Sequence, residues 1–521
     1  MNSPASSALK SLRWVPVCQL EESRRADDDD DEGRTRGYSY TGCGPGETYL
    51  IQYTSGATGP AKPVAVTAGS AAHNARAARA AYAVHPGSVV ASWLPQYHDC
   101  GLMFLLLTVA AGVTCVLASP AAFLRRPRLW LELVAEFRAT CTPVPSFALP
   151  LVLRRGRFTG SESEEEMTRP VQLGSLRNLI LINEPIYESS VDEFVKEFAS
   201  AGLDASAISP SYGLAENCTF VSTAWRGTEP RLPSNKKLLP SARLPALLVP
   251  GEEPEIEIVV VDGRTGEPVA DGVEGEIWIS SPSNASGYLR NTTAAASRDA
   301  FCASVPGRPG TSFVRTGDCG VVSGPERYLY VLGRTADAIA VTINDDGQRR
   351  VHAHYVETAA FESSPEYLRG GCVAAFATSP SSVAVVAELR KGTGDGADLR
   401  KNICDGVRRA VWKEEGVSVG SVVLVESGGL PKTTSGKLRR GLAREKLLAG
   451  ELPKVFVADY AENNADVSTS TWLRDGSKDK CRTSWVVPEA AAASGELGGM
   501  VVMTSGNATI SHSRLRLQSS L

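Results

Sequence analysis

Residues 48–62 read TYLIQYTSGATGPAK, and this stretch is the strongest local signal in the chain. Residues 49–53 have the apolar and aromatic character of a strand, and residues 54–62 form a glycine-rich turn that carries hydroxyls and Lys62. Hydroxyls and exposed backbone N–H groups can surround phosphate oxygens, and a lysine adds positive charge. The turn is not a Walker A loop, which would need glycine at Ala61 and serine or threonine at Pro63. Taken alone, it can equally be an ordinary turn.

Outward from this turn, short apolar strands alternate with helices. We predict strands over residues 89–94, 113–118 and 178–182, and helices over residues 71–83, 128–137 and 188–200. Leu129, Leu133 and Phe137 are four residues apart, which is the spacing of one helical face. Alternating strands and helices favour an α/β fold with a mainly parallel sheet that helices cover on both faces.

After Tyr212 the pattern becomes rich in strands, and a smaller α+β unit follows. In it we predict strands over residues 372–377, 383–389 and 421–425, and helices over residues 398–412 and 438–448. The chain is therefore divided into four parts: a partly disordered lead-in (1–46), a large domain (47–333), a small domain (334–452) and a Ser/Ala/Gly-rich tail that we expect to be disordered (453–521).

Composition excludes several classes of protein. Of 521 residues, 43% are hydrophobic and 21% charged, as in globular chains. The net charge of −4 argues against a nucleic-acid partner, and no run of about 18 apolar residues indicates a transmembrane segment. Eleven scattered cysteines and the absence of a secretory signal favour a reduced, cytoplasmic protein. The first residues resemble a plastid transit peptide only faintly. His352 and His354 have no cysteine or acidic cluster beside them in sequence, so a histidine metal site is not expected.

Four further segments carry candidate functional residues. They are YHDCGL (97–102), YGLAE (212–216), TGD with GR (316–318 and 333–334) and PKTTSGK (431–437). In this order, together with the turn, they resemble the adenylate-forming, or AMP-binding, superfamily over residues 48–450. The chain looks most like the fatty acyl-AMP ligases, on the evidence of IQYTSGATG, SWLPQYHDCGL, SPAAFLRRPRLWLELVAEFRAT and SYGLAE.

The resemblance implies an ATP site with Mg²⁺. Tyr212 would lie against adenine, and Asp318 and Arg334 would hold the ribose. Glu216 would bind Mg²⁺, which prefers oxygen ligands. The residues implied to hold the ATP phosphates are Thr54, Ser55, Thr58 and Lys62.

The same resemblance implies the catalytic residues. Lys437 would act from a mobile small domain and, with Mg²⁺, offset negative charge while a carboxylate attacks the α-phosphorus. His98 would lie beside the acyl pocket and gate it, next to apolar residues that suit either a lipid or the core. Each of these residues, taken singly, can also be an ordinary loop or surface residue.

The expected activity is conversion of a fatty acid and ATP to acyl-AMP and pyrophosphate, with transfer to an acyl carrier protein. A ligase that forms acyl-CoA is one alternative. A non-catalytic module that binds nucleotide or a protein partner is the other.

Several positions depart from the family pattern. A much shorter segment than usual precedes the turn, so we expect the large domain to be truncated at its N-terminus. Pro63 stands where glycine is usual, and Ala61 where proline is usual. Residues 181–185 read LINEP in place of an NGAEP-like run, which leaves either large side chains at the nucleotide or a shortened turn. Ala336 occupies the usual hinge position, and residues 344–354 look rebuilt.

Overall fold

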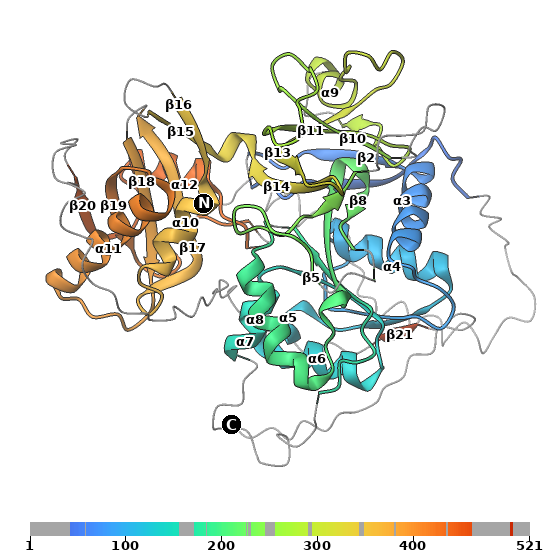
Figure 1. Ribbon diagram of the computed structural model, residues 1–521, viewed down its shortest axis with the longest axis horizontal. Helices are drawn as coiled ribbons and strands as arrows, with labels where there is room; N and C mark the ends of the chain where they lie inside the picture. The colour runs from blue at the N-terminus through green and yellow to red at the C-terminus, as the bar shows by residue number, and fades with distance from the viewer. Residues whose placement is uncertain are drawn as a thin grey trace, which may run out of the picture. The chain divides into compact units, whose positions relative to one another are not determined.

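The computed structural model describes most of the chain from residue 42 to residue 460 (Figure 1). The contacts discussed below lie within the unit Gly44–Leu521. Nearly all of the lead-in falls outside the described residues. The described ranges are 42–57, 59–155, 171–183, 185–225, 227, 231–244, 256–289, 294–342, 348–379, 382–433, 436–460 and 501–503.

A seven-stranded sheet forms the centre of the large part, in the order β21-β4-β3-β5-β6-β7-β8. Strands β4 to β7 pair in parallel, while β21 and β8 pair antiparallel at the two edges. This confirms the expected mainly parallel sheet. The strands are β3 (Val89–Ser92), β4 (Thr114–Leu117), β5 (Cys141–Pro145), β6 (Asn178–Ile182), β7 (Ile208–Leu214), β8 (Thr219–Thr223) and β21 (Val501–Met503).

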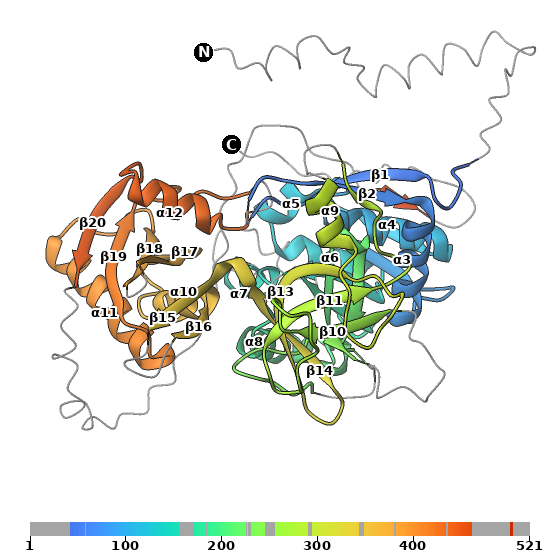
Figure 2. The ribbon, with the colours of Figure 1, turned by 90° about the horizontal axis from the view of Figure 1, so that it is seen from above.

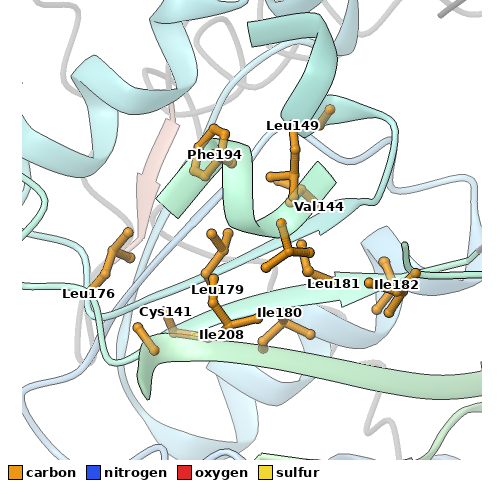
Figure 3. Packing of buried hydrophobic residues seen from close by; sticks show 14 of the residues in the cluster. Cys141, Val144, Leu149, Leu176, Leu179, Ile180, Leu181, Ile182, Phe194 and Ile208 are labelled. Atoms are coloured by element: carbon orange, nitrogen blue, oxygen red, sulfur yellow. The ribbon is translucent and has the colours of Figure 1, made fainter. Parts of the chain in front are cut away.

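Helices α3 to α8 pack around this sheet and bury its apolar side chains. Every residue of β6 (NLILI) is buried, as a central parallel strand requires. Leu149 of α7 and Phe194 of α8 join the same core (Figure 3). The helices are α3 (Ala68–Ala81), α4 (Asp99–Ala111), α5 (Pro120–Arg125), α6 (Arg128–Glu136), α7 (Ala148–Arg155) and α8 (Glu188–Phe198).

Two antiparallel sheets complete residues 48–334. Strands β1 and β2 form a hairpin, which β12 extends to three strands, and Figure 2 shows the hairpin edge-on. A second sheet has the order β10-β11-β13-β14-β9, and α9 (Ala294–Phe301) packs on it. The strands are β1 (Thr48–Tyr53), β2 (Pro63–Thr67), β12 (Gly287–Tyr288), β9 (Ala242–Arg243), β10 (Glu257–Val261), β11 (Gly275–Ser280), β13 (Val314–Ser323) and β14 (Tyr328–Arg334).

Residues 338–459 form a hairpin and a four-stranded sheet, as expected for a small α+β unit. Strand β20 pairs antiparallel with β19, so the tail expected to begin at residue 453 is instead part of a sheet over residues 454–459. The elements are β15 (Ala338–Thr342), β16 (Gln348–His352), α10 (Ala353–Glu362), β17 (Leu368–Ser379), β18 (Ser382–Leu389), α11 (Ala397–Glu415), β19 (Val419–Val425), α12 (Arg440–Leu448) and β20 (Lys454–Asp459). Among the described helices, none has the length and apolar character needed to cross a membrane.

Candidate active site

The glycine-rich turn is the tip of the β1–β2 hairpin. The Thr54 N–H donates to the Lys62 carbonyl at 3.0 Å, and the Lys62 N–H donates to Oγ1 of Thr54 at 2.9 Å. Gly56 has a φ of +68°, and a Cβ there would lie 3.2 Å from the carbonyl oxygen of Gly59. A residue with a side chain is therefore strained at this position. Thr54 closes the base of the turn, a role that the sequence did not predict.

The other residues of the turn differ in their exposure to solvent. Ser55 and Lys62 are exposed, as phosphate-binding groups need to be, and Thr58 lies outside the described residues. Pro63 is the buried first residue of β2, a place where a strand tolerates proline. Its carbonyl accepts a hydrogen bond from the Leu289 N–H at 2.8 Å, so the hairpin accommodates this departure from the family pattern.

Tyr288 connects the turn to Glu216. Nζ of Lys62 lies 4.8 Å from the centroid of the Tyr288 ring, and the Tyr288 hydroxyl donates to Oε1 of Glu216 at 2.7 Å. Burial and the neighbouring Glu216 carboxylate raise the pKa of Tyr288, so it stays a neutral donor. No sequence motif pointed to Tyr288. It enters through β12, which pairs with β2 directly after the turn.

Glu216 is held by a sharp reversal of the chain. It lies in a short 3-10 helix, η3 (Ala215–Asn217), between β7 and β8. At Gly213 a Cβ would lie 1.8 Å from the carbonyl oxygen of Thr219, because β8 folds back closely on β7. The glycine of the YGLAE motif is therefore required by this close approach. The half-buried Glu216 carboxylate has the oxygen ligands that Mg²⁺ prefers.

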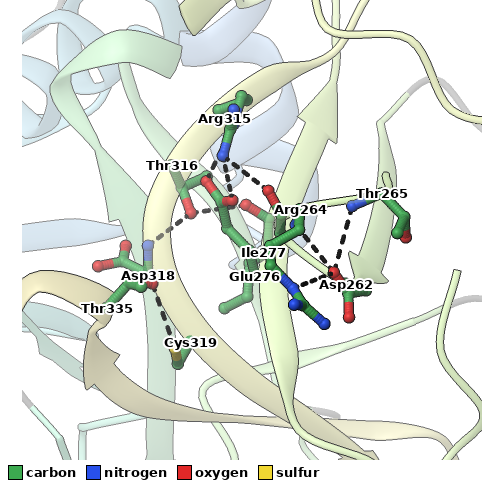
Figure 4. A network of polar contacts seen from close by, with 11 residues as sticks. Asp262, Arg264, Thr265, Glu276, Ile277, Arg315, Thr316, Asp318, Cys319 and Thr335 are labelled. Atoms are coloured by element: carbon green, nitrogen blue, oxygen red, sulfur yellow. Dashed lines mark hydrogen bonds and ion pairs between the residues drawn. The ribbon is translucent and has the colours of Figure 1, made fainter. Parts of the chain in front are cut away.

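The three residues predicted to bind the nucleoside lie together. Nε of Arg334 is 2.8 Å from Oδ1 of Asp318, and the Tyr212 hydroxyl donates to Oδ2 at 2.6 Å. Burial and the Asp318 charge hold the pKa of Tyr212 well above its usual value. The Asp318 N–H donates to Oγ1 of Thr316, whose hydroxyl donates to the Ile277 carbonyl (Figure 4). A carboxylate accepts about four hydrogen bonds, so Asp318 keeps acceptor capacity for ribose hydroxyls.

Arg334 lies within electrostatic range of both the Tyr212–Asp318 pair and the Glu216–Tyr288 pair. Its charge acts on Asp318 and Tyr212, and also on Glu216 and Tyr288. The fold therefore brings the glycine-rich turn, the candidate magnesium ligand and the candidate nucleoside-binding residues close together.

His98 and Asp99 begin α4 at a second part of the site. Nδ1 of His98 contacts Oδ1 of Asp99, which also accepts the Cys100 N–H at 2.9 Å. The Cys100 thiol donates to Oδ1 of Asn183 at 3.2 Å. Asn183 has a φ of +79°, a conformation that asparagine adopts more readily than most residues. In the LINEP segment, Leu181 and Ile182 end β6 and are buried in the core, and Asn183 follows as a bend.

The charge of Lys437 acts on Asp99 at the start of α4. Burial opposes ionisation of Asp99, but the hydrogen bond and charge of His98, with the charge of Lys437, hold the pKa of Asp99 below its usual value. The Lys437 N–H donates to Oγ1 of Thr433 at 3.1 Å, which closes the Gly/Ser/Thr loop. The structure therefore brings Lys437 within electrostatic range of the His98–Asp99 pair.

A cavity of about 30 Å³ lies beside α4. Asp99, Leu102, Met103 and Leu106 are among its lining residues. This volume has room for roughly one or two water molecules, so it holds no acyl chain in the present conformation. Phe104, one of the apolar residues that follow His98, is 1% exposed and belongs to the core.

Residues 4–289 match the family model of AMP-binding enzymes. "Probable long-chain-fatty-acid–AMP ligase FadD30" of Mycobacterium tuberculosis is 31% identical over 438 residues, which are 78% of this chain and 71% of that protein. This chain belongs to the AMP-binding enzyme family.

Two further comparisons agree with this assignment to the AMP-binding enzymes. The medium-chain fatty acid acyl-carrier-protein ligase JamA of Moorena producens is 28% identical over 86% of this chain and 74% of that protein. A solved structure from a study of fatty acyl-adenylate ligases of E. coli and L. pneumophila has a TM-score of 0.63 at 25% identity, and the match covers 79% of this chain and 72% of that one. As an AMP-binding enzyme, the chain is an ATP-dependent ligase that forms an acyl adenylate.

Proposed function

We propose that this AMP-binding enzyme joins a fatty acid to AMP and then passes the acyl group to the thiol of a carrier protein. The Asp318 carboxylate, oriented by Tyr212 and Arg334 within one site that also holds Glu216, is the observation that carries the proposal. The names of the relatives support a fatty acid as the substrate and a carrier protein as the acceptor.

In the first step a carboxylate oxygen of the fatty acid attacks the α-phosphorus of ATP. The new bond forms as the bond from the α-phosphorus to the bridging oxygen breaks, and pyrophosphate leaves. Asp318 accepts hydrogen bonds from the ribose, and Lys62 with the hairpin turn holds the departing phosphates. Glu216 would hold Mg²⁺, which neutralises phosphate charge when bound.

Lys437 supplies a positive charge to this step. We propose that residues 334–452 form a mobile domain and that Lys437 reaches the reacting phosphate when this domain closes. The charge of Lys437 already acts on Asp99 at the start of α4, where His98 would face the acyl group. In the second step the carrier thiol attacks the acyl carbon, and AMP leaves.

The test is pyrophosphate release measured with MgATP and a series of medium- and long-chain fatty acids. We expect release to depend on both substrates. A second assay offers the acyl-AMP product to a phosphopantetheinylated carrier protein or to CoA, and acyl-carrier formation is expected to dominate. Faster acyl-CoA formation would overturn the proposed acceptor. Nucleotide binding without any acid-dependent pyrophosphate release would reject the enzyme in favour of a binding module.

A further inference from the structure

Three side chains that are remote in sequence form a cluster beside the nucleotide site. They are Glu274, Cys319 and His352, and their candidate ligand atoms all lie within 4.8 Å of one another. No sequence motif groups them, because neither Cys319 nor Glu274 is near His352 along the chain. We propose that these three residues form a site for a divalent metal ion of the zinc type.

The geometry combines a buried base with an open edge. Nε2 of His352 lies 2.8 Å from Oε1 of Glu274. His352 and Cys319 are 5% and 2% exposed, whereas the Glu274 side chain is 34% exposed and gives an ion access. The Cys319 sulfur contacts Oγ1 of Thr335 at 3.2 Å (Figure 4).

One atom of the cluster is unsatisfied. Nδ1 of His352 is buried and makes no hydrogen bond to the described residues. Nε2 is the ring nitrogen that faces Glu274, so Nε2 is the candidate ligand atom of His352, and Nδ1 would carry the ring proton.

The donor types select the class of ion. Imidazole nitrogen, thiolate sulfur and carboxylate oxygen are the ligands of zinc, whereas magnesium takes oxygen ligands. A thiolate and a carboxylate together carry two negative charges, which balance a divalent cation. In a tetrahedral zinc site neighbouring ligand atoms are about 3.3–3.7 Å apart, given the usual bond lengths. His352 and Glu274, whose nearest atoms are 2.8 Å apart, would therefore separate slightly around the ion, and the fourth position would be left for a further ligand.

Two positively charged side chains near Glu274 would repel a bound metal ion. Arg350 and Lys236 act electrostatically on Glu274. Their presence predicts moderate affinity and gives a further test, since Arg350 is exposed on β16 and can be replaced without disturbing the core.

The location gives the site a mechanical consequence. Cys319 lies on β13 next to Asp318, while His352 is the N-cap of α10. The chain between them passes through η4 (Thr335–Asp337) and the β15–β16 hairpin. A bound ion would therefore tie the start of the small unit to the sheet that holds Asp318 and Arg334.

The experiment is a titration of the metal-stripped full chain with Co²⁺, a spectroscopic substitute for Zn²⁺. We expect a thiolate-to-cobalt charge-transfer band that saturates at one ion per chain and is displaced by Zn²⁺. Cys319→Ser should abolish the band, and Glu274→Gln should weaken Co²⁺ binding at least tenfold. Arg350→Gln should strengthen it. Cys404→Ser, which removes a buried thiol on α11, is the matched control and should leave the band unchanged.

No saturable band in the wild-type chain would overturn the proposal, as would a band that persists in both Cys319→Ser and His352→Gln. Near-ultraviolet circular dichroism reports whether each variant is folded. If Cys319→Ser is unfolded, the exposed Glu274→Gln decides: unchanged Co²⁺ affinity would reject the site. None of these readouts depends on ligase activity.

Discussion

Asp318 and Arg334 are cross-strand neighbours on β13 and β14, and their charged groups meet at 2.8 Å. The register of one hairpin thus sets the distance between the ribose acceptor and its counter-ion. Tyr212 approaches from β7, a strand of the seven-stranded sheet, and its hydroxyl donates a hydrogen bond to the second carboxylate oxygen of Asp318. The candidate nucleoside site therefore draws its residues from two sheets.

The hydroxyl of Tyr212 should matter more than its bulk. Tyr212→Phe keeps the ring but removes a hydrogen bond to a charged acceptor, which is worth about 1.5–3 kcal/mol. We expect ATP binding to weaken by roughly ten- to a hundredfold, measured by calorimetry and by the rise in melting temperature that MgATP produces. Tyr330→Phe is the control, because the Tyr330 hydroxyl donates to the Pro233 carbonyl. Equal ATP affinity in wild type and Tyr212→Phe would contradict the role of this hydroxyl.

Tyr288→Phe tests the candidate magnesium ligand. The change removes the hydrogen bond that orients Glu216 but keeps the ring beside Lys62. We expect the Mg²⁺ concentration for half-maximal pyrophosphate release to rise about tenfold or more, since outer-shell partners of metal ligands typically contribute about ten- to a hundredfold to metal affinity. Binding of ATP without Mg²⁺ should change little. Loss of metal-free ATP binding with an unaltered Mg²⁺ requirement would place Tyr288 in nucleotide binding instead.

Lys437→Ala should lower the rate of adenylation without weakening ATP binding. One lost electrostatic stabiliser of a transition state costs about a hundredfold or more, or roughly 2.7 kcal/mol. Acid-dependent pyrophosphate release gives kcat, and calorimetry gives the affinity for ATP. Lys454→Ala, an exposed lysine on β20, is the matched control. A kcat equal to that of wild type would remove Lys437 from the mechanism.

Asp99 should make stability depend on pH. Its pKa in the folded chain lies below the ordinary value of an aspartate, so the charged form favours the folded state. This contribution is fully present above about pH 4, the pKa of an unfolded aspartate, and is lost as the pH falls through the folded-state pKa. Asp99→Asn should therefore be less stable than wild type near neutral pH, and the difference in unfolding free energy should shrink in acid. Urea unfolding across this pH range measures the difference. The exposed Asp395→Asn is the control, and a gap between wild type and Asp99→Asn that stays constant with pH would refute the assignment.

The sequence predicted those parts of the fold and site that depend on local pattern. The run NLILI indicated β6 with its bounds as observed, since a strand covered on both faces is apolar at nearly every position. The motif order placed Glu216, Asp318 and Arg334 in one site, and the structure brings these residues within electrostatic range of one another. Their functional roles remain predictions.

Other features depend on contacts that no local pattern encodes. Tyr288 reaches Glu216 because β12 pairs with β2, and a two-residue strand has no periodicity to detect. Strand β20 was missed because its short alternation lies beside a Ser/Ala/Gly-rich stretch, and its pairing with β19 is what orders it. Cys319 and Glu274 join His352 only when β13 and β16 are both in place.

The pairing of β13 with β14 also determines where insertions and deletions would leave the candidate site intact. Successive residues of a strand face opposite sides of the sheet, so deleting one residue between Asp318 and Ser323 would turn the carboxylate away from Arg334. Residues inserted at the exposed turn around Gly324 would leave the pairing intact. Relatives of this chain should therefore vary in length at that turn and keep a fixed count of residues along the two strands.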